Sequence, residues 1–174
     1  VQISRILLNC RTVKNCRSER SAMQIQIDSR EKERAIKDIV SYFDKNQIRH
    51  ISSKLYVGDY MNMDNPRLII DRKQNLTEVC GNVCQQHKRF TAELQKAADA
   101  NIKLILLIEH GSGIYCLQDI NYWYNPRLKV SPLAVSGPRL FKILYSIQKK
   151  YDIGMEFCDK KQTGAEIVRL LKCK

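Results

Sequence analysis

The sequence lacks a hydrophobic run long enough for a membrane span or a secretory signal. The apolar stretch nearest its N-terminus, ILLN at residues 6–9, is far shorter than either requires. Repeats and low-complexity segments are also missing from the sequence. These absences argue against membrane-embedded, exported and solenoid proteins, and they indicate an ordinary globular chain.

The sequence also lacks the cysteine pattern of a disulfide framework. The seven cysteines are an odd number in a chain that is not small, so they indicate a reducing compartment, the cytoplasm. Cys80, Cys84 and His87 have the spacing C-x3-C-x2-H, but no second ligand pair follows. We expect the three residues to share one helical face on which the thiols pack, with a zinc site as the alternative.

Acidic residues are scarce relative to basic ones. Against 30 Lys and Arg stand 18 Asp and Glu, a net charge of +12 in 174 residues. Such an excess points to a polyanionic partner such as nucleic acid, and a basic protein without such a partner is the alternative. Residues 1–22 carry five of the basic residues and one acid, show no regular period, and precede Met23. We expect them to be a flexible basic leader or sequence upstream of the natural start, and the folded domain to span residues 23–174.

Hydrophobic periodicity predicts alternating strands and helices after the leader. Strands are expected at residues 23–27, 47–53, 54–63, 67–73, 103–109 and 154–158, and helices at residues 28–46, 75–101, 137–152 and 163–172. We expect Asp28 or Ser29 to cap the first helix and the second helix to break near Gly81. The continuous apolar run KLILLIE at residues 103–109 is typical of a central strand buried on both faces. The pattern predicts one α/β domain with a central mixed sheet flanked by helices.

The turn MNMDNP joins two predicted strands into a hairpin that brings two carboxylates together. If the hairpin is symmetric about Asn65, Asp59 faces Asp71 with Cβ atoms about 4.5–5.5 Å apart. Two carboxylates this close repel one another in a partly buried site, unless one is protonated or a cation lies between them. Oxygen ligands with room for water and phosphate suit Mg²⁺ or Mn²⁺.

Lys73 is expected on the same face of the strand as Asp71, and Arg72 on the other. Two acids, a divalent ion and a lysine suit phosphodiester hydrolysis, because the metal polarises the phosphate and the lysine orients the water or offsets developing charge. The acid-x-Lys triplet alone is weak, since it recurs at residues 159–161. An exposed ion pair on an edge strand is therefore the alternative.

The ordered stretches IDSRE, VGDY, IIDRK and LLIE resemble the nuclease domain of XPF-type structure-specific endonucleases, of the PD-(D/E)XK superfamily. That family has D-x-R-E after its first strand, then G-D-Y, then E-R-K, and the resemblance covers about residues 24–172. It implies a restriction-endonuclease-like fold and a metal-dependent endonuclease for branched or otherwise structured DNA. The stretches SKLYVGDY and CQQHKRF look like minimal versions from bacteriophages and prophages, which implies phage DNA metabolism in the cytoplasm of a bacterial host.

The resemblance also implies roles for individual residues. Asp59 and Asp71 would bind the metal, Lys73 would assist the water, Arg72 would replace the family's arginine, and Asp28 and Glu31 would be further acidic members. The family's usual glutamate is Asp71 here, one methylene shorter, so we expect activity to survive with a shifted metal preference. We find neither the helicase-like region nor the tandem helix-hairpin-helix module of larger relatives, so a homodimer stays open and DNA-shape specificity is undefined.

Several cations are candidates for DNA contacts. They are Arg30, Lys88, Arg89, Arg127, Lys160 and Lys161. Lys88 and Arg89 lie on the long helix after the site, where a solvated helix face is the alternative. Lys160 and Lys161 precede the last helix, whose N-terminus with Thr163 can hold a phosphate.

Three further features leave their alternatives open. Trp123 and residues 125–129 would stack on and clamp single-stranded DNA, or they form an ordinary packed loop. His87 is a general acid or base, or a structural histidine. Glu109 ends the central strand near the site and would support it. The rival function is a non-catalytic DNA-binding or recombination accessory protein with a vestigial site.

Overall fold

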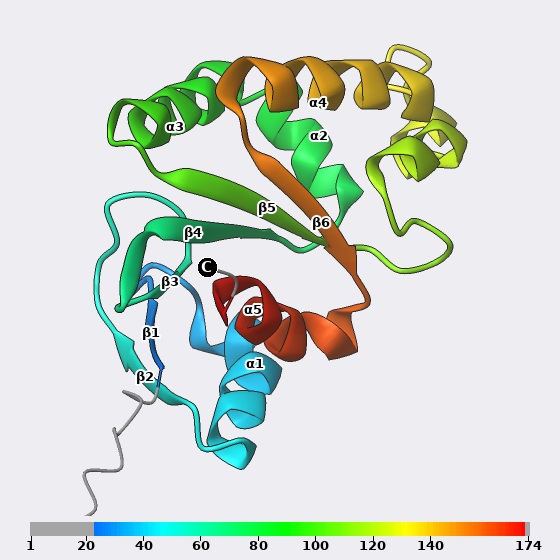
Figure 1. The fold of residues 1–174 in the computed structure, drawn as a ribbon. Helices are drawn as coiled ribbons and strands as arrows, with labels where there is room; N and C mark the ends of the chain where they lie inside the picture. Colours follow the sequence, from blue (N-terminus) through cyan, green and yellow to red (C-terminus); the bar gives the residue numbers. More distant parts are fainter. Residues whose placement is uncertain (1–22, 173–174) are drawn as a thin grey trace, which may run out of the picture.

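A computed structural model of the chain describes residues 23–172. The expectation for residues 1–22 lies outside this range. Strands and helices alternate along the described chain (Figure 1). The strands are β1 (Gln24–Ile27), β2 (Arg49–Ser52), β3 (Tyr60–Asn62), β4 (Asn65–Lys73), β5 (Lys103–Glu109) and β6 (Gly154–Cys158). The helices are α1 (Glu33–Lys45), α2 (Leu76–Cys84), α3 (His87–Asp99), α4 (Gly137–Tyr151) and α5 (Thr163–Lys172), with short 3-10 helices η1 (Leu117–Tyr122), η2 (Pro126–Lys129) and η3 (Lys160–Gln162).

The strands form one mixed sheet in the order β2-β1-β3-β4-β5-β6. β4, β5 and β6 are parallel to one another, while β3 is antiparallel to both β1 and β4. Figure 1 shows α2, α3 and α4 over one face of the sheet and α1 and α5 over the other. The expected α/β domain with a central mixed sheet is therefore confirmed.

Alternate residues of the central strands supply two hydrophobic cores. On β4, Ile69 packs into the core beneath α2, α3 and α4, whereas Ile70 packs beneath α1 and α5. Leu106 and Leu107 divide in the same way on β5, as expected for a strand that is buried on both faces. Because the alternation continues to the end of β4, it sends successive polar side chains to opposite faces.

The start of the first helix differs from the prediction. α1 begins at Glu33, its N-cap is Lys32, and that residue makes no side-chain capping bond among the described residues. The expectation that Asp28 or Ser29 caps the helix is therefore wrong. The physical reason is that the Asp28 carboxylate accepts hydrogen bonds from elsewhere in the fold, including the Leu55 amide at 2.8 Å.

The break in the long helix lies later than predicted. α2 runs through Gly81 and ends at Cys84, and the Gly81 carbonyl accepts the amides of both Gln85 and Gln86 at 3.0 and 2.9 Å. His87 begins the next helix. Cys84 and His87 consequently belong to different helices, so the predicted shared face of Cys80, Cys84 and His87 is wrong. Cys80 is buried and Cys84 is exposed.

The connection from β5 to α4 was expected to be irregular, and it contains only the 3-10 helices η1 and η2. Pro138 lies in the first turn of α4, as predicted. Within residues 23–172, none of the helices combines the length and the apolar character that crossing a bilayer would require.

Candidate active site

The hairpin of β3 and β4 pairs in the register expected for a centre at Asn65. Tyr60 lies opposite Ile70, which is one position inward from Asp59 and Asp71. Asp71 lies on β4 and pairs with Leu106 of β5, whereas Asp59 lies in the bend immediately before β3. At the other end of the hairpin the register shifts between Met61 and Asn62, and the tight turn falls at residues 63–64.

Main-chain contacts fix the position of Asp59. Its amide donates to the Ile70 carbonyl at 2.8 Å, and its Oδ2 accepts the Arg72 amide at 2.7 Å. Gly58 precedes it with φ of +67°, and a Cβ there would lie 2.6 Å from Cγ2 of Ile69. Because Gly58 has no Cβ, the chain can pass close to β4 at this point, which brings the Asp59 carboxylate into the site.

Asp71 and Lys73 form a buried ion pair on the face covered by α2 and α3. The Lys73 ammonium lies 2.8 Å from both Asp71 oxygens but donates a well-oriented hydrogen bond only to Oδ1. Asp71 Oδ2 is buried and has no hydrogen-bond partner among the described residues. Beyond the ammonium lies the Phe90 ring, 5.8 Å from Nζ to its centroid. The alternative of an exposed surface ion pair is therefore wrong, because both side chains are buried.

The electrostatics of the site favour a cation. Burial, followed by the charges of Asp71 and Glu31, raises the pKa of Asp59 well above its ordinary value. Burial alone would lower the pKa of Lys73, but the charge and hydrogen bond of Asp71 outweigh it and raise that pKa. The Asp59 carboxyl lies close to other acids, and Oδ2 of the neighbouring Asp71 has no hydrogen bond among the described residues. This arrangement fits a divalent ion with oxygen ligands. In residues 23–172 no three or more His, Cys, Asp and Glu residues group as a metal centre.

Arg72 points to the opposite face and joins two further acids. Its guanidinium donates to Glu109 Oε1 and to Glu31 Oε2, each at 3.0 Å. The Thr163 hydroxyl donates to the same Glu109 oxygen at 2.8 Å, which ties α5 to the end of β5. Thr163 is buried, so its hydroxyl does not face a phosphate as the sequence suggested. The positions of Glu31 and Glu109 around one guanidinium were not foreseen.

Asp28 lies beside the site, since its amide donates to the Asp59 carbonyl at 2.8 Å. Both of its oxygens are occupied: Arg30 donates to Oδ1 through Nε and its amide at 2.7 Å, and to Oδ2 through Nη2 at 2.8 Å, next to the Leu55 amide. Burial would raise the pKa of Asp28, but these hydrogen bonds lower it. This carboxylate is therefore suited to holding the loop after β1, and Arg30 is largely engaged with it.

The other candidate cations divide into near and distant groups. Arg89, in the first turn of α3, lines a cavity of about 250 Å³ together with Lys73 and Phe90. Lys88 and His87 are exposed beside it. Lys160 and Lys161 form the exposed helix η3 between β6 and α5, and Arg127 lies in η2.

Burial of Trp123 excludes the alternative in which it stacks on DNA and favours the alternative of an ordinary packed loop. The Trp123 side chain is only 9% exposed and belongs to the core beneath α4, because the backbone turns it inward between two exposed neighbours, Tyr122 and Tyr124. Those two tyrosines were missed. Three consecutive aromatic residues signalled an unusual segment, but their order alone does not say which one is buried.

The mixed sheet brings the G-D-Y and D-R-K stretches together in one hairpin, as the order of these stretches in the sequence implied. Residues 27–171 match the family model of the ERCC4 domain, so the chain belongs to that family. The resemblance drawn from the sequence is confirmed at this level, and the fold class with it.

Solved structures agree in fold. XPF from Aeropyrum pernix superposes with a TM-score of 0.60 at 19% identity, covering 86% of this chain and 63% of that one. XPF from the same organism in complex with DNA gives a TM-score of 0.58 at 18% identity, covering 86% and 64%. The chain thus spans less than two thirds of the length of either structure. No curated protein matches it.

Proposed function

We propose that this domain is a divalent-metal-dependent endonuclease that hydrolyses phosphodiester bonds in branched or otherwise structured DNA. The observation that carries the proposal is the hairpin, in which Asp59, just before β3, accepts the amide of Arg72 next to Asp71, while Lys73 donates to Asp71. Nuclease domains of the ERCC4 family depend on a divalent metal. Asp59 and Asp71 would hold it here, as Mg²⁺ or Mn²⁺.

The bound ion would polarise the scissile phosphate and lower the pKa of a water molecule. Lys73 contributes as a donor rather than a base, since Asp71 raises its pKa and keeps it an ammonium. It orients the attacking water and offsets charge on the phosphate oxygens. The water oxygen bonds to phosphorus while the bond to one deoxyribose oxygen breaks, and the leaving oxygen takes up a proton.

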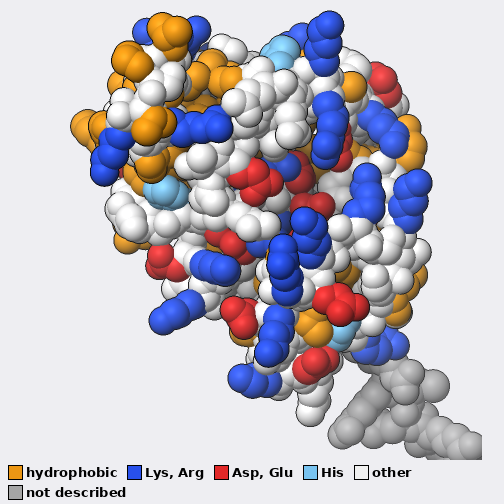
Figure 2. Space-filling view, turned by 180° about the vertical axis from the view of Figure 1, so that it is seen from behind, with side chains coloured by type: hydrophobic (Ala, Val, Ile, Leu, Met, Phe, Trp, Pro, Cys, Tyr) orange, Lys and Arg blue, Asp and Glu red, His pale blue; other side chains and the backbone are white. Residues whose placement is uncertain are grey.

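A DNA substrate is supported by charge. The chain carries +12, and Figure 2 shows Lys and Arg side chains spread over one face of the molecule with acidic side chains among them. Cations of this kind bind phosphates without reading the sequence. One of the similar XPF structures is itself a complex with DNA. The phage or prophage setting is part of the proposal and rests on the stretches SKLYVGDY and CQQHKRF.

Cleavage of a panel of flaps, forks, four-way junctions, single strands and duplexes with Mg²⁺ or Mn²⁺ tests the proposal. We expect Asp71→Asn and Lys73→Ala each to lose about 100-fold or more of the cleavage rate, the size of loss typical of a group that stabilises transition-state charge. Asp64→Asn, an exposed acid in the turn of the same hairpin, is the matched control. Unchanged cleavage by both site variants would remove the proposal. DNA binding by the wild type without cleavage in either metal would instead favour the non-catalytic alternative.

A further inference from the structure

The connection from β5 to α4 presents two tyrosines to solvent. Tyr122 is 89% exposed and Tyr124 is 57% exposed, while Trp123 between them is 9% exposed. We call Tyr122 and Tyr124 the tyrosine ridge. Large aromatic side chains that cluster at the surface mark an interaction site more often than chance exposure.

The ridge is held rigidly from below. The Trp123 amide donates to the Ile120 carbonyl at 3.0 Å, and the His110 ring packs edge-on against the indole with centroids 6.2 Å apart. Asn125 is buried, and its Nδ2 donates to the Val135 carbonyl at 2.8 Å. Because buried groups on both sides of Tyr124 fix the backbone, binding here would order little additional chain.

The charge around the ridge suits a polyanion. Residues 114–139 contain three cations, Arg127, Lys129 and Arg139, against one acid, Asp119. The Asp119 carboxylate accepts two backbone hydrogen bonds of 2.9 and 3.0 Å within its own segment. In Figure 2, hydrophobic side chains with Lys and Arg among them gather at the upper left, which corresponds to the position of this segment in Figure 1.

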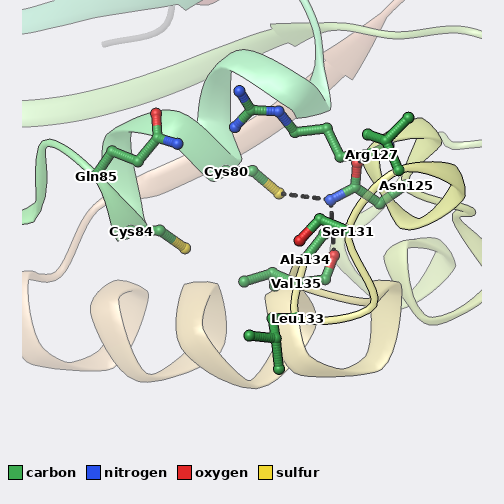
Figure 3. A pocket seen from close by; sticks show the side chains of 10 residues that line it. Cys80, Cys84, Gln85, Asn125, Arg127, Ser131, Leu133, Ala134 and Val135 are labelled. Carbon is green, nitrogen blue, oxygen red and sulfur yellow. Dashed lines mark hydrogen bonds between the residues drawn. The ribbon is translucent and has the colours of Figure 1, made fainter.

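A cavity of about 430 Å³ lies between α2 and the loop that follows the ridge in the sequence (Figure 3). Its walls come from the C-terminal half of α2 and from residues 125–135, and Arg127, Gln85 and Ser131 supply polar groups. Figure 3 shows the Arg127 side chain extending from the loop toward α2. An aromatic surface next to a hollow with a guanidinium fits flat bases and their phosphates.

The segment leaves the sheet at the catalytic edge. It follows Glu109 at the end of β5, and the neighbouring Ile108 pairs with Lys73 on β4. Figure 1 shows the connection emerging at that end of β5. The connection that carries the ridge thus starts at the end of the strand that pairs with Lys73.

We propose that the tyrosine ridge, with Arg127 and Lys129, binds an unpaired segment of the DNA strand adjoining the bond to be cut. The proposal rests on the proposed function for its substrate. The two rings stack on bases, and the two cations contact phosphates. A protein partner would bury the exposed Val130 and Leu133, but the excess of cations and the paired tyrosines favour nucleic acid.

The test is binding without metal, in EDTA, so that cleavage plays no part. Trp123 is the only tryptophan of the chain, and its fluorescence reports on the ridge as oligo-dT or a blunt duplex is titrated. We expect Tyr122→Ala with Tyr124→Ala to weaken binding of oligo-dT by about fivefold or more for each ring removed, and to leave duplex binding nearly unchanged. The pair Tyr122→Phe with Tyr124→Phe should bind like the wild type, because the rings remain.

The matched control is Tyr145→Ala, a partly exposed tyrosine on α4. Unchanged oligo-dT affinity in the alanine pair would overturn the proposal, as would loss of binding in the phenylalanine pair, whose small change preserves folding. A protein that binds oligo-dT as expected but cleaves no DNA with Mg²⁺ or Mn²⁺ would defeat the nuclease proposal and leave the ridge standing.

Discussion

The main-chain amide of Arg72 donates a 2.7 Å hydrogen bond to Oδ2 of Asp59. The same strand, one residue earlier, carries Asp71. β4 thus holds one carboxylate by its backbone and presents the second by its side chain. Repulsion between the two acids is not relieved by Asp59 swinging away, because that movement would cost its hydrogen bond. The hairpin therefore keeps the two carboxyl groups close together in a largely buried site.

Asp59→Asn is expected to stabilise the metal-free protein near neutral pH, by an amount on the order of 1 kcal/mol. Burial and the neighbouring acids raise the pKa of Asp59 above its ordinary value of 3.8. Between that value and the raised folded-state pKa, the folded protein holds a proton that the unfolded chain has lost, so stability falls as pH rises through this window. Urea denaturation across the acidic to neutral range should show this slope in the wild type and a flatter one in the variant.

The same variant separates metal binding from stability. Mg²⁺ or Mn²⁺ should raise the melting temperature of the wild type by binding the folded state, and should raise that of Asp59→Asn much less. The control Asp64→Asn should behave as the wild type in both measurements. Identical pH slopes for wild type and Asp59→Asn would show that Asp59 carries no raised pKa.

Asp71→Glu tests whether the shorter acid sets the metal preference. Glutamate is the acid usual at this position in XPF-type nucleases, which the sequence resembles. Its longer side chain keeps a carboxylate within reach of Lys73. We expect cleavage within about tenfold of the wild type, since the oxygen ligand is retained, and a changed ratio of Mg²⁺ to Mn²⁺ activity. The measurement is the cleavage rate of Asp71→Glu in Mg²⁺ and in Mn²⁺, with Asp71→Asn as the reference expected to be inactive. A variant as inactive as Asp71→Asn would mean that the site tolerates only aspartate.

Gly58→Ala is expected to destabilise the fold by about 1–3 kcal/mol, because φ of +67° is strained for alanine. The new Cβ would also lie 2.6 Å from Cγ2 of Ile69 on the neighbouring strand. Cleavage should fall further than stability alone explains, since Asp59 moves with the displaced backbone. Thermal melts and rates measured well below the melting point separate these effects. Gly113→Ala is the control for positive φ without a clash, as a Cβ there has open space.

Arg72→Met should destabilise the protein by about 3–5 kcal/mol, the usual cost of removing one partner from a buried ion pair. Its loss leaves Glu109 buried beside Thr163 without a cation. Adding Glu109→Gln should recover much of the loss, because the neutral amide still accepts from the threonine hydroxyl. Chemical denaturation of the two single variants and the double variant gives the coupling. Additive losses would contradict a shared buried network.

Much of the fold was readable from the sequence because the hydrophobic pattern is strong. All six strands were expected, and the two-sided burial of β5 follows from its unbroken apolar run. The pairing of Tyr60 with Ile70 follows the predicted centre at Asn65, although Asp59 itself lies before β3 and the turn falls at residues 63–64. The elements that carry the core were therefore determined locally.

The remaining differences come from contacts between distant residues. Asp28 is a good capping residue, but its carboxylate binds the nearby Arg30 guanidinium and the Leu55 amide, and Leu55 is too far along the chain to be visible in a local pattern. Glu31 and Glu109 both accept hydrogen bonds from the Arg72 guanidinium. These contacts require β4, the end of β5 and the loop after β1 to meet in space. Trp123 is buried because its side chain faces the core beneath α4. Its neighbours Tyr122 and Tyr124 are aromatic as well, so residue type alone does not indicate which of the three is buried.

The bond between Arg72 and Asp59 spans 13 residues, whereas Asn62 reaches the Leu171 carbonyl across 109 residues. Short loops close quickly and at small entropic cost. During synthesis, the hairpin with both carboxylates is complete long before α5 leaves the ribosome. We expect the half of the site that carries Asp59 and Asp71 to assemble first, and the last helix to close it from the other side of the sheet.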